Sequence, residues 1–224
     1  MEDVSHPGQF DLLTEGEAHA PSRAERRDQQ IHRILDAAKA CFLRFGFQGA
    51  SMNQICAEVG MSPGALYRYF PSKEAIIEAI CEADRKQDAE KFAAMDENPC
   101  VVDGFLNAAM GHIRYIHESG NAPIFAEIHT EALRNEAIRA ISERCMGEVQ
   151  EKFRNYLQAA IDRGDIDPIV ELDALMPMIM AIGHGLAIND LPGAGVPYDR
   201  IEKLMRATIE ALFRPGTSYK HPGN

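Results

Sequence analysis

The sequence predicts an all-α protein in which a small N-terminal three-helix unit with a helix-turn-helix precedes a larger antiparallel helical body. Apolar residues recur at helical spacing along most of the 224 residues. No run of alternating β-branched and aromatic residues marks a strand. Breakers such as Asn98-Pro99, Gly120 and the segment 193–197 divide the helical stretches. A hydrophobic content of 46% is ordinary for a folded globule and excludes disorder throughout.

The first helix is expected from Arg26 to Phe45. Residues 1–25 mix Gly, Pro, His and acidic side chains without periodicity, so we predict a disordered leader there. From Ile31 onward, apolar residues face one side of the expected helix. Gly46 ends it, because glycine enters the left-handed conformation without a Cβ clash.

Residues 51–73 predict two short helices joined by a tight turn. Ser51 and Gln54 have the spacing of a capping box, so a helix should begin at Met52. Gly60 ends this helix, and Ser62-Pro63 starts the next, since proline fits the first helical position. Two helices so closely joined cross steeply, which leaves the second free to enter a DNA major groove.

The rest of the chain is expected to be helical. A fourth helix follows the turn residues and runs from Lys73 to about Met95. Five more are expected at Val101–Glu118, Ala122–Leu133, Glu136–Arg163, Leu172–Asn189 and Asp199–Phe213. We therefore divide the chain into a helix-turn-helix domain at 26–80, a helical body at 81–214 and a flexible tail at 215–224.

Charge is distributed unevenly along the chain. The formal net charge is −11, but residues 22–73 carry a net charge of +4, whereas residues 1–21 carry −5 and residues 74–224 carry −10. A basic module on an acidic body would meet phosphates with one end only. The overall acidity therefore does not exclude a nucleic-acid partner.

Cysteine usage and hydropathy favour a cytoplasmic protein. The five cysteines form no CxxC pair, and we expect them to be reduced core residues. The first residues lack a charged segment followed by an apolar run, and no segment approaches the roughly 18 apolar residues of a membrane span. We expect no membrane partner.

Three ordered motifs closely resemble the DNA-binding signature of the TetR-type transcriptional regulators. They are FGF at 45–47, ICAEVGMS at 55–62 and LYRYFPSKE at 66–74. The resemblance implies a ligand-responsive repressor that binds a palindromic double-stranded operator as a homodimer and is released by a small-molecule effector. It also implies that the last two long helices form the dimer interface and that residues 81–214 bind the effector.

The resemblance places DNA contacts in and around the helix-turn-helix. It implies that Tyr67 and Lys73 contact the DNA backbone, and that Ser51 and Asn53 reach phosphate or a base edge; hydroxyl, ammonium and amide groups suit phosphate oxygens. Only Arg68 has donors suited to guanine. The remaining expected contacts come from Pro63, Gly64, Ala65 and Tyr69, and Tyr69 has core packing as an equal alternative.

Polar and adaptable side chains that interrupt the apolar faces of the body are candidates for an effector pocket. Effector pockets are mostly apolar with a few oriented polar groups, although each such residue could instead fill the core. The candidates are Phe105, His112, Tyr115, Phe125, His129, Met146, Phe153, Met178 and His184.

Other function classes find less support in the sequence. The spacing of the histidines and Glu127 is not a zinc motif, so we predict no metal site and no cofactor. The body lacks a nucleophile elbow, a phosphate loop and an HExxH motif, and we therefore do not expect an enzyme. An enzyme with a DNA-binding appendage and an accessory regulator acting through protein contacts are the alternatives to a ligand-responsive repressor.

Overall fold

The computed structural model describes residues 22–216, apart from the side chains of residues 87–92. The described part is helical, with one isolated β-bridge between Ile166 and Pro215 and no strand. None of its helices is long and apolar enough to cross a membrane. The helices are α1 (Arg23–Gly49), α2 (Met52–Val59), α3 (Pro63–Tyr67), α4 (Lys73–Asp96), α5 (Val101–Glu118), α6 (Ala122–Ala132), α7 (Glu136–Asp162), α8 (Leu172–Ile188) and α9 (Tyr198–Phe213).

The start of α1 differs from the sequence prediction. Ser22 is the N-cap, its hydroxyl accepts a hydrogen bond from the Glu25 amide, and the Glu25 carboxylate accepts one from the Ser22 amide. This capping box begins the helix at Arg23, so residues 22–25 do not belong to a leader. Residues 1–21 of the predicted leader lie outside the described residues.

The end of α1 bends where the sequence predicted a stop. Gly46 has φ +70° and ψ 163°, which interrupts the helical backbone, and one further turn continues to Gly49. The bend directs Phe47 into the core, where its ring lies 5.4 Å from that of Phe42.

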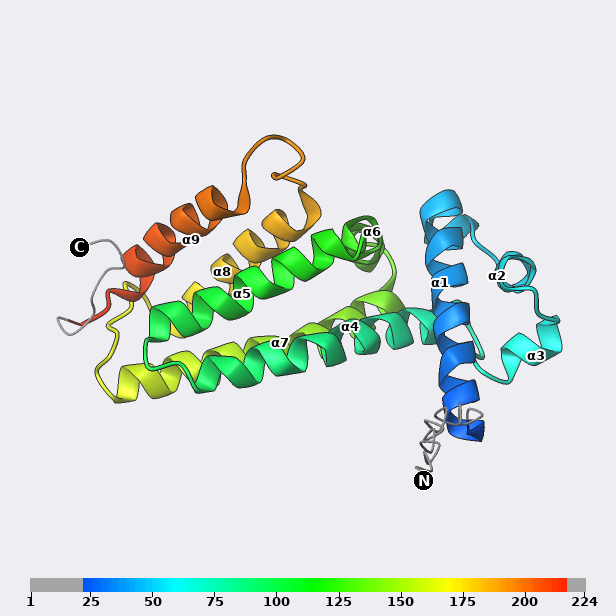
Figure 1. Ribbon diagram of the computed structural model, residues 1–224, viewed down its shortest axis with the longest axis horizontal. Helices are drawn as coiled ribbons and strands as arrows, with labels where there is room; N and C mark the ends of the chain where they lie inside the picture. Colours follow the sequence, from blue (N-terminus) through cyan, green and yellow to red (C-terminus); the bar gives the residue numbers. More distant parts are fainter. Residues whose placement is uncertain (1–21, 217–224) are drawn as a thin grey trace, which may run out of the picture.

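Two groups of helices meet at α1 (Figure 1). α1 crosses the end of the helical body, with α2 and α3 on its far side and α4 leading back into the body alongside α7. α5, α6, α8 and α9 complete the body, and α6 lies at the end that contacts α1. The helix-turn-helix therefore projects from one end of an elongated molecule.

The buried core has two clusters that do not separate at residue 80. One packs α1, α2, α3 and the first turns of α4 against Ile124 and Ile128 of α6 and Ile138 and Ile141 of α7. The other joins α5, the second half of α7, α8 and α9. Since α4 also runs through residue 80 without interruption, the two ends of the molecule are mechanically connected.

The predicted tail begins with ordered residues. Pro215 pairs with Ile166, and the Gly216 amide donates a 2.9 Å hydrogen bond to the Asp165 carbonyl. Residues 217–224 of the predicted tail lie outside the described part of the chain.

Candidate functional site

Local capping defines the helix-turn-helix. The Gln54 amide donates to Ser51 Oγ at 3.2 Å, and the Ser51 amide donates to Gln54 Oε1 at 2.7 Å, so α2 begins with the expected capping box. Gly60 ends α2 in the left-handed conformation, at φ 72° and ψ 38°. Two residues later, Ser62 Oγ accepts a hydrogen bond from the Ala65 amide and caps α3.

The outer surface of α2 and α3 exposes most of the predicted DNA contacts. Leu66 is fully buried beneath α3, whereas Tyr67 remains 50% exposed beside it. Ala65 is half-buried. The exposed members of the predicted set are Ser51, Asn53, Pro63, Gly64, Tyr67 and Arg68.

Two predicted contact residues also have partners within the protein. The Tyr69 ring is partly buried against the core, with the Arg27 guanidinium 5.2 Å from its centroid. Lys73 Nζ donates to the carbonyl oxygens of Phe47 at 2.6 Å and Ala50 at 2.7 Å. The centroid of the Phe47 ring also lies 4.5 Å from Lys73 Nζ, so a phosphate contact would have to use the third of the three ammonium donors.

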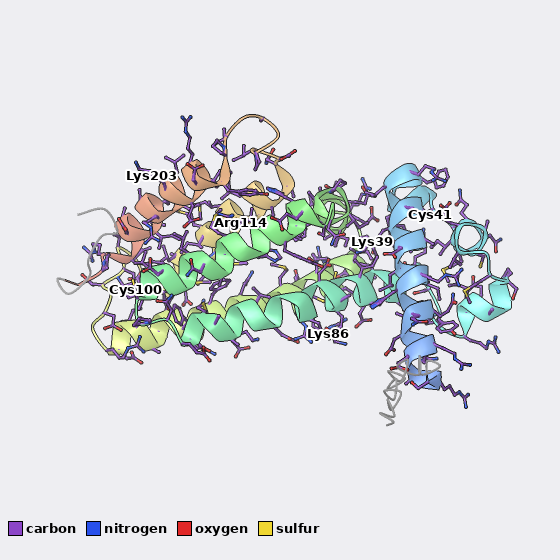
Figure 2. The ribbon with its side chains drawn as sticks, in the orientation of Figure 1. Lys39, Cys41, Lys86, Cys100, Arg114 and Lys203 are labelled. Atoms are coloured by element: carbon purple, nitrogen blue, oxygen red, sulfur yellow. The ribbon has the colours of Figure 1, made fainter. Side chains whose placement is uncertain are left out.

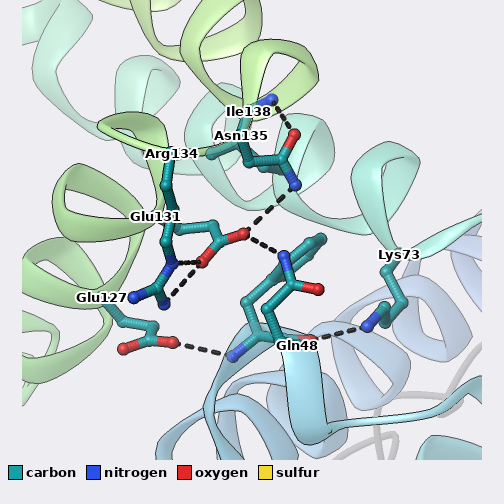
Figure 3. A network of polar contacts seen from close by, with 8 residues as sticks. Gln48, Lys73, Glu127, Glu131, Arg134, Asn135 and Ile138 are labelled. Carbon is teal, nitrogen blue, oxygen red and sulfur yellow. Dashed lines mark hydrogen bonds and ion pairs between the residues drawn. The ribbon is translucent and has the colours of Figure 1, made fainter.

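A polar network joins the helix-turn-helix to α6 (Figure 3). Glu127 Oε1 accepts a 2.7 Å hydrogen bond from the Phe47 amide, directly after the bend in α1. Glu131, only 1% exposed, accepts hydrogen bonds from the side chains of Gln48, Arg134 and Asn135. The network fixes the end of α1 to one face of α6.

The hydrogen bonds around Glu131 compensate for the burial of its charge. Burial raises the pKa of Glu131, but the donors from Gln48, Arg134 and Asn135 together outweigh that effect and hold the pKa below its usual value. A buried carboxylate with three donors stabilises one arrangement of α1 against α6, because losing a donor would leave a buried charge poorly compensated.

A second polar connection links α1 to the interior of the body. Lys39 lies on α1 where it meets the body (Figure 2), and its ammonium donates to Asn121 Oδ1 at 3.2 Å. Asn121 Nδ2 in turn donates to Asp84 Oδ1 at 3.4 Å. Asp84 also lines a cavity in the body, so this chain of contacts leads from the helix-turn-helix end of the molecule to that cavity.

The body contains a cavity of about 110 Å³ among α4, α5, α6, α7, α8 and α9. Its wall is mainly apolar, as in ligand pockets generally. Seven of the nine predicted pocket residues line it: Phe105, His112, Phe125, His129, Met146, Phe153 and His184.

Met178 and Tyr115 do not line the cavity. Met178 lies on another face of α8 from the lining residues Ile179 and Gly183, and its side chain is 49% exposed. Tyr115 lies behind the wall, where its hydroxyl donates to Asp84 Oδ1 at 3.4 Å. Met178 is one residue from Ile179 and five residues from Gly183, and side chains at these spacings point to different sides of a helix.

Three histidines meet around Phe125 in the cavity wall. The Phe125 ring centroid lies 4.2 Å from that of His129, 5.7 Å from that of His184 and 6.2 Å from that of His112. Burial lowers the pKa of His129, and burial with the neighbouring histidines lowers the pKa of His184 to about 4. Both imidazoles are therefore neutral near pH 7.

Several cavity and junction residues were not predicted from sequence. Cys81, Asp84 and Arg85 line the cavity from α4, and none of the three was among the pocket candidates predicted from the sequence. The Glu131–Gln48 contact joins residues 83 positions apart. The only local signal was Arg134, three residues after Glu131 on the same helical face. Within residues 22–216, leaving aside the side chains of residues 87–92, no group of three His, Cys, Asp or Glu side chains is positioned to hold a metal ion.

Comparisons with known proteins agree with this arrangement. The family model for bacterial regulatory proteins of the tetR family matches residues 34–80. The HTH-type transcriptional regulator UidR of Escherichia coli K12 is 30% identical over 155 residues, which cover 69% of this chain and 78% of UidR. The HTH-type transcriptional repressor AcnR of Corynebacterium glutamicum is 23% identical over 161 residues, or 72% of this chain and 81% of AcnR.

A solved structure extends the similarity to the body. Salmonella enterica GusR superimposes with a TM-score of 0.72 at 26% sequence identity, and the match covers 83% of this chain and 96% of GusR. The similarity therefore includes the helices that surround the cavity as well as the helix-turn-helix.

Proposed function

Since the chain belongs to the TetR family of bacterial regulatory proteins, we propose that it is a repressor that binds a palindromic operator as a homodimer and leaves it when a small molecule occupies the cavity. Its relatives are transcriptional regulators, and the chain is a helix-turn-helix transcriptional regulator rather than an enzyme. The similarity to AcnR, an HTH-type transcriptional repressor, supports repression as the direction of regulation.

The main support for the proposal is that α6 contacts both the cavity and the end of α1. Phe125, Ile128 and His129 of this helix line the cavity. Glu127 and Glu131 of the same helix hold the end of α1 through Phe47 and Gln48. A ligand that displaces α6 must therefore displace or break the contacts that position the helix-turn-helix, which is how one site biases another.

The DNA-binding surface is proposed to be the exposed side of α2 and α3. Tyr67, Ser51 and the remaining N–H of Lys73 supply phosphate donors that fix the protein on the duplex. Arg68 supplies the bidentate donor for guanine, and Ala65 offers a methyl group to thymine. Asn53, Pro63, Gly64 and Tyr69 complete the proposed surface.

The dimer interface is proposed to be the outer face of α8 and α9. α8 exposes a stripe of apolar residues at helical spacing, made of Ala174, Pro177, Met178, Ala181 and Ile188. α9 adds Leu204, which is 67% exposed. Contiguous apolar surface of this kind marks an interaction site, and a two-fold dimer would present two helix-turn-helix units to a palindrome.

Selection of bound sites from a random duplex pool tests the proposed function. The purified protein at a stated, near-physiological salt concentration should enrich a palindrome whose half-sites are spaced for a two-fold dimer. The Arg68→Ala variant is the matched control, because it should lose the enriched guanine while keeping affinity for duplex DNA in general. A folded protein that enriches no sequence would contradict the proposal.

A further inference from the structure

Two imidazole nitrogens in the cavity wall lack hydrogen-bond partners. The Nε2 atoms of His129 and His184 are buried, and neither contacts a donor or acceptor among the described residues. The two rings lie 4.7 Å apart, between centroids, and both line the cavity. Buried polar atoms are nearly always paired, so two unpaired nitrogens in one cavity point to a ligand that pairs with them.

The hydrogen-bonding role of His129 follows from its other nitrogen. Its Nδ1 lies 2.9 Å from the Phe125 carbonyl oxygen, and a carbonyl only accepts hydrogen bonds. Nδ1 therefore carries the proton. Because the ring is neutral, Nε2 has a free lone pair and requires a donor from the ligand.

His184 complements His129. Its ring is also neutral near pH 7, and no hydrogen bond among the described residues fixes its tautomer, so its Nε2 is free to donate or accept. A hydroxyl group donates one hydrogen bond and accepts up to two. One hydroxyl could thus donate to His129 and accept from His184.

The rest of the cavity indicates which kind of ligand would bear this hydroxyl group. The wall around the histidines includes the aromatic rings of Phe105, Phe125 and Phe153, with Phe105 and Phe153 4.6 Å apart between centroids. The volume of about 110 Å³ is close to that of engineered apolar cavities of ~150 Å³ that hold a benzene ring. The cation among the lining residues, Arg85, is already paired with Glu82 and Glu148. Apolar walls and neutral imidazoles therefore disfavour a carboxylate, whose charge would lose its hydration without gaining an unpaired cation.

We propose that the cavity binds a small neutral phenol, whose ring lies among the phenylalanines and whose hydroxyl donates to Nε2 of His129 and accepts from Nε2 of His184. This inference rests on the proposed function, because it identifies the chemical class of the effector. Such binding requires both histidines to be neutral. Two charged side chains, Asp84 and Arg85, also face the cavity, and both belong to α4.

The test compares three probes of similar size on the full-length protein at pH 7.5. Calorimetry should show that 4-methylphenol binds at least tenfold more tightly than toluene, which lacks the hydroxyl, and more tightly than benzoate, which replaces it with a carboxylate. His129→Phe should remove the preference for 4-methylphenol over toluene, since it keeps a ring but removes the acceptor. Met146→Leu, a change in the same cavity wall that removes no hydrogen-bonding nitrogen, should preserve the preference.

Several results would overturn the proposal. Equal binding of 4-methylphenol and toluene by the unmodified protein would exclude a role for the nitrogens, and tighter binding of benzoate would indicate an anion site. Binding of none of the three probes by the folded protein would also reject it.

The same preparations separate this inference from the proposed function. A protein that enriches a palindrome but binds no probe loses only the phenol inference. One that binds 4-methylphenol with the stated selectivity but enriches no DNA sequence loses only the repressor function. Release of the enriched duplex by 4-methylphenol, and not by toluene at the same concentration, would support both.

Discussion

At the scale of single residues, neighbouring side chains on α3 are suited to different tasks. Tyr67 and Arg68 are both exposed, but a phenol hydroxyl offers a single donor, whereas a guanidinium matches the two acceptors of guanine. Adjacent residues on one helix end can therefore contribute separately to affinity and to specificity.

Substitution of these two residues should separate the two contributions. Tyr67→Phe removes one phosphate donor and should weaken binding to all duplexes by a similar factor. Arg68→Ala should cost about 1 to 3 kcal/mol on the selected site and relax its sequence preference at one position. Affinity measurements on the selected duplex and on a scrambled duplex distinguish these outcomes. Equal, sequence-selective losses in both variants would contradict this division of roles.

The neutral state of His184 predicts a pH dependence of stability. Its pKa is about 4 in the folded protein and about 6.5 when unfolded, so the unfolded chain binds more protons between these values. The free energy of unfolding should therefore decrease as the pH falls from 6.5 toward 4, by roughly 3 kcal/mol at most. Urea unfolding at several pH values measures this slope.

A matched variant isolates the contribution of His184. The phenylalanine in His184→Phe cannot be protonated, so the free energy of unfolding of this variant should change less between pH 6.5 and 4. Protonation of Glu131 affects stability at lower pH, because the pKa of Glu131 is depressed in the folded protein. Identical pH profiles for the variant and the unmodified protein would show that His184 does not titrate in this way. His112 and His129 face the same cavity and remain in both proteins.

At the scale of helices, local capping accounts for the helix-turn-helix and long-range packing accounts for its attachment to the body. The boundaries of α2 were predicted from Ser51, Gln54 and Gly60, because each acts on backbone groups within a few residues. The α1–α6 junction was not predicted, since it unites Gln48 with Glu131 across 83 positions.

Seven residues that line the cavity were predicted from interruptions in the apolar helix faces. Met178 was misplaced, because apolar spacing does not distinguish a face that packs in the core from an exposed apolar face.

Two glycines near the turn test the importance of backbone conformation. Gly60→Ala places a Cβ at φ +72° and should destabilise the protein by about 1 kcal/mol, although no atom lies within 4 Å of the added carbon. Gly64→Ala, in α3 and also in open space, should be neutral or slightly stabilising. Thermal unfolding of both variants compares the effects, and equal destabilisation would contradict a conformational origin.

At the scale of the whole molecule, the proposed function requires two copies of the chain and communication along its length. The basic helix-turn-helix segment, with its net charge of +4, lies at one end of the molecule and the acidic body extends from it. An acidic body is repelled by phosphate, so electrostatics should favour the orientation in which α2 and α3 face the duplex.

Charged side chains introduced into the proposed interface should separate the two subunits. Met178→Glu combined with Leu204→Glu places charges in the centre of the apolar stripe, and the protein should sediment as a monomer at micromolar concentration. Leu133→Glu alters a residue that is 85% exposed at the end of α6, outside the stripe, and should leave the dimer intact. A monomer in the unmodified protein would exclude the proposed interface.

A connection between the cavity and the DNA-binding surface is tested most directly by measuring whether filling the cavity weakens DNA binding. Gly183 lines the cavity and Gly147 does not, yet both are helical glycines with no atom within 4 Å of an added Cβ. Gly183→Leu and Gly147→Leu therefore change helix propensity alike, while only the first places a side chain in the cavity. We expect Gly183→Leu to lower the affinity for the selected palindrome about 5-fold or more, which corresponds to a coupling of about 1 kcal/mol, and Gly147→Leu to leave it unchanged. Equal affinities of the two folded variants would contradict a connection between the cavity and the DNA-binding surface.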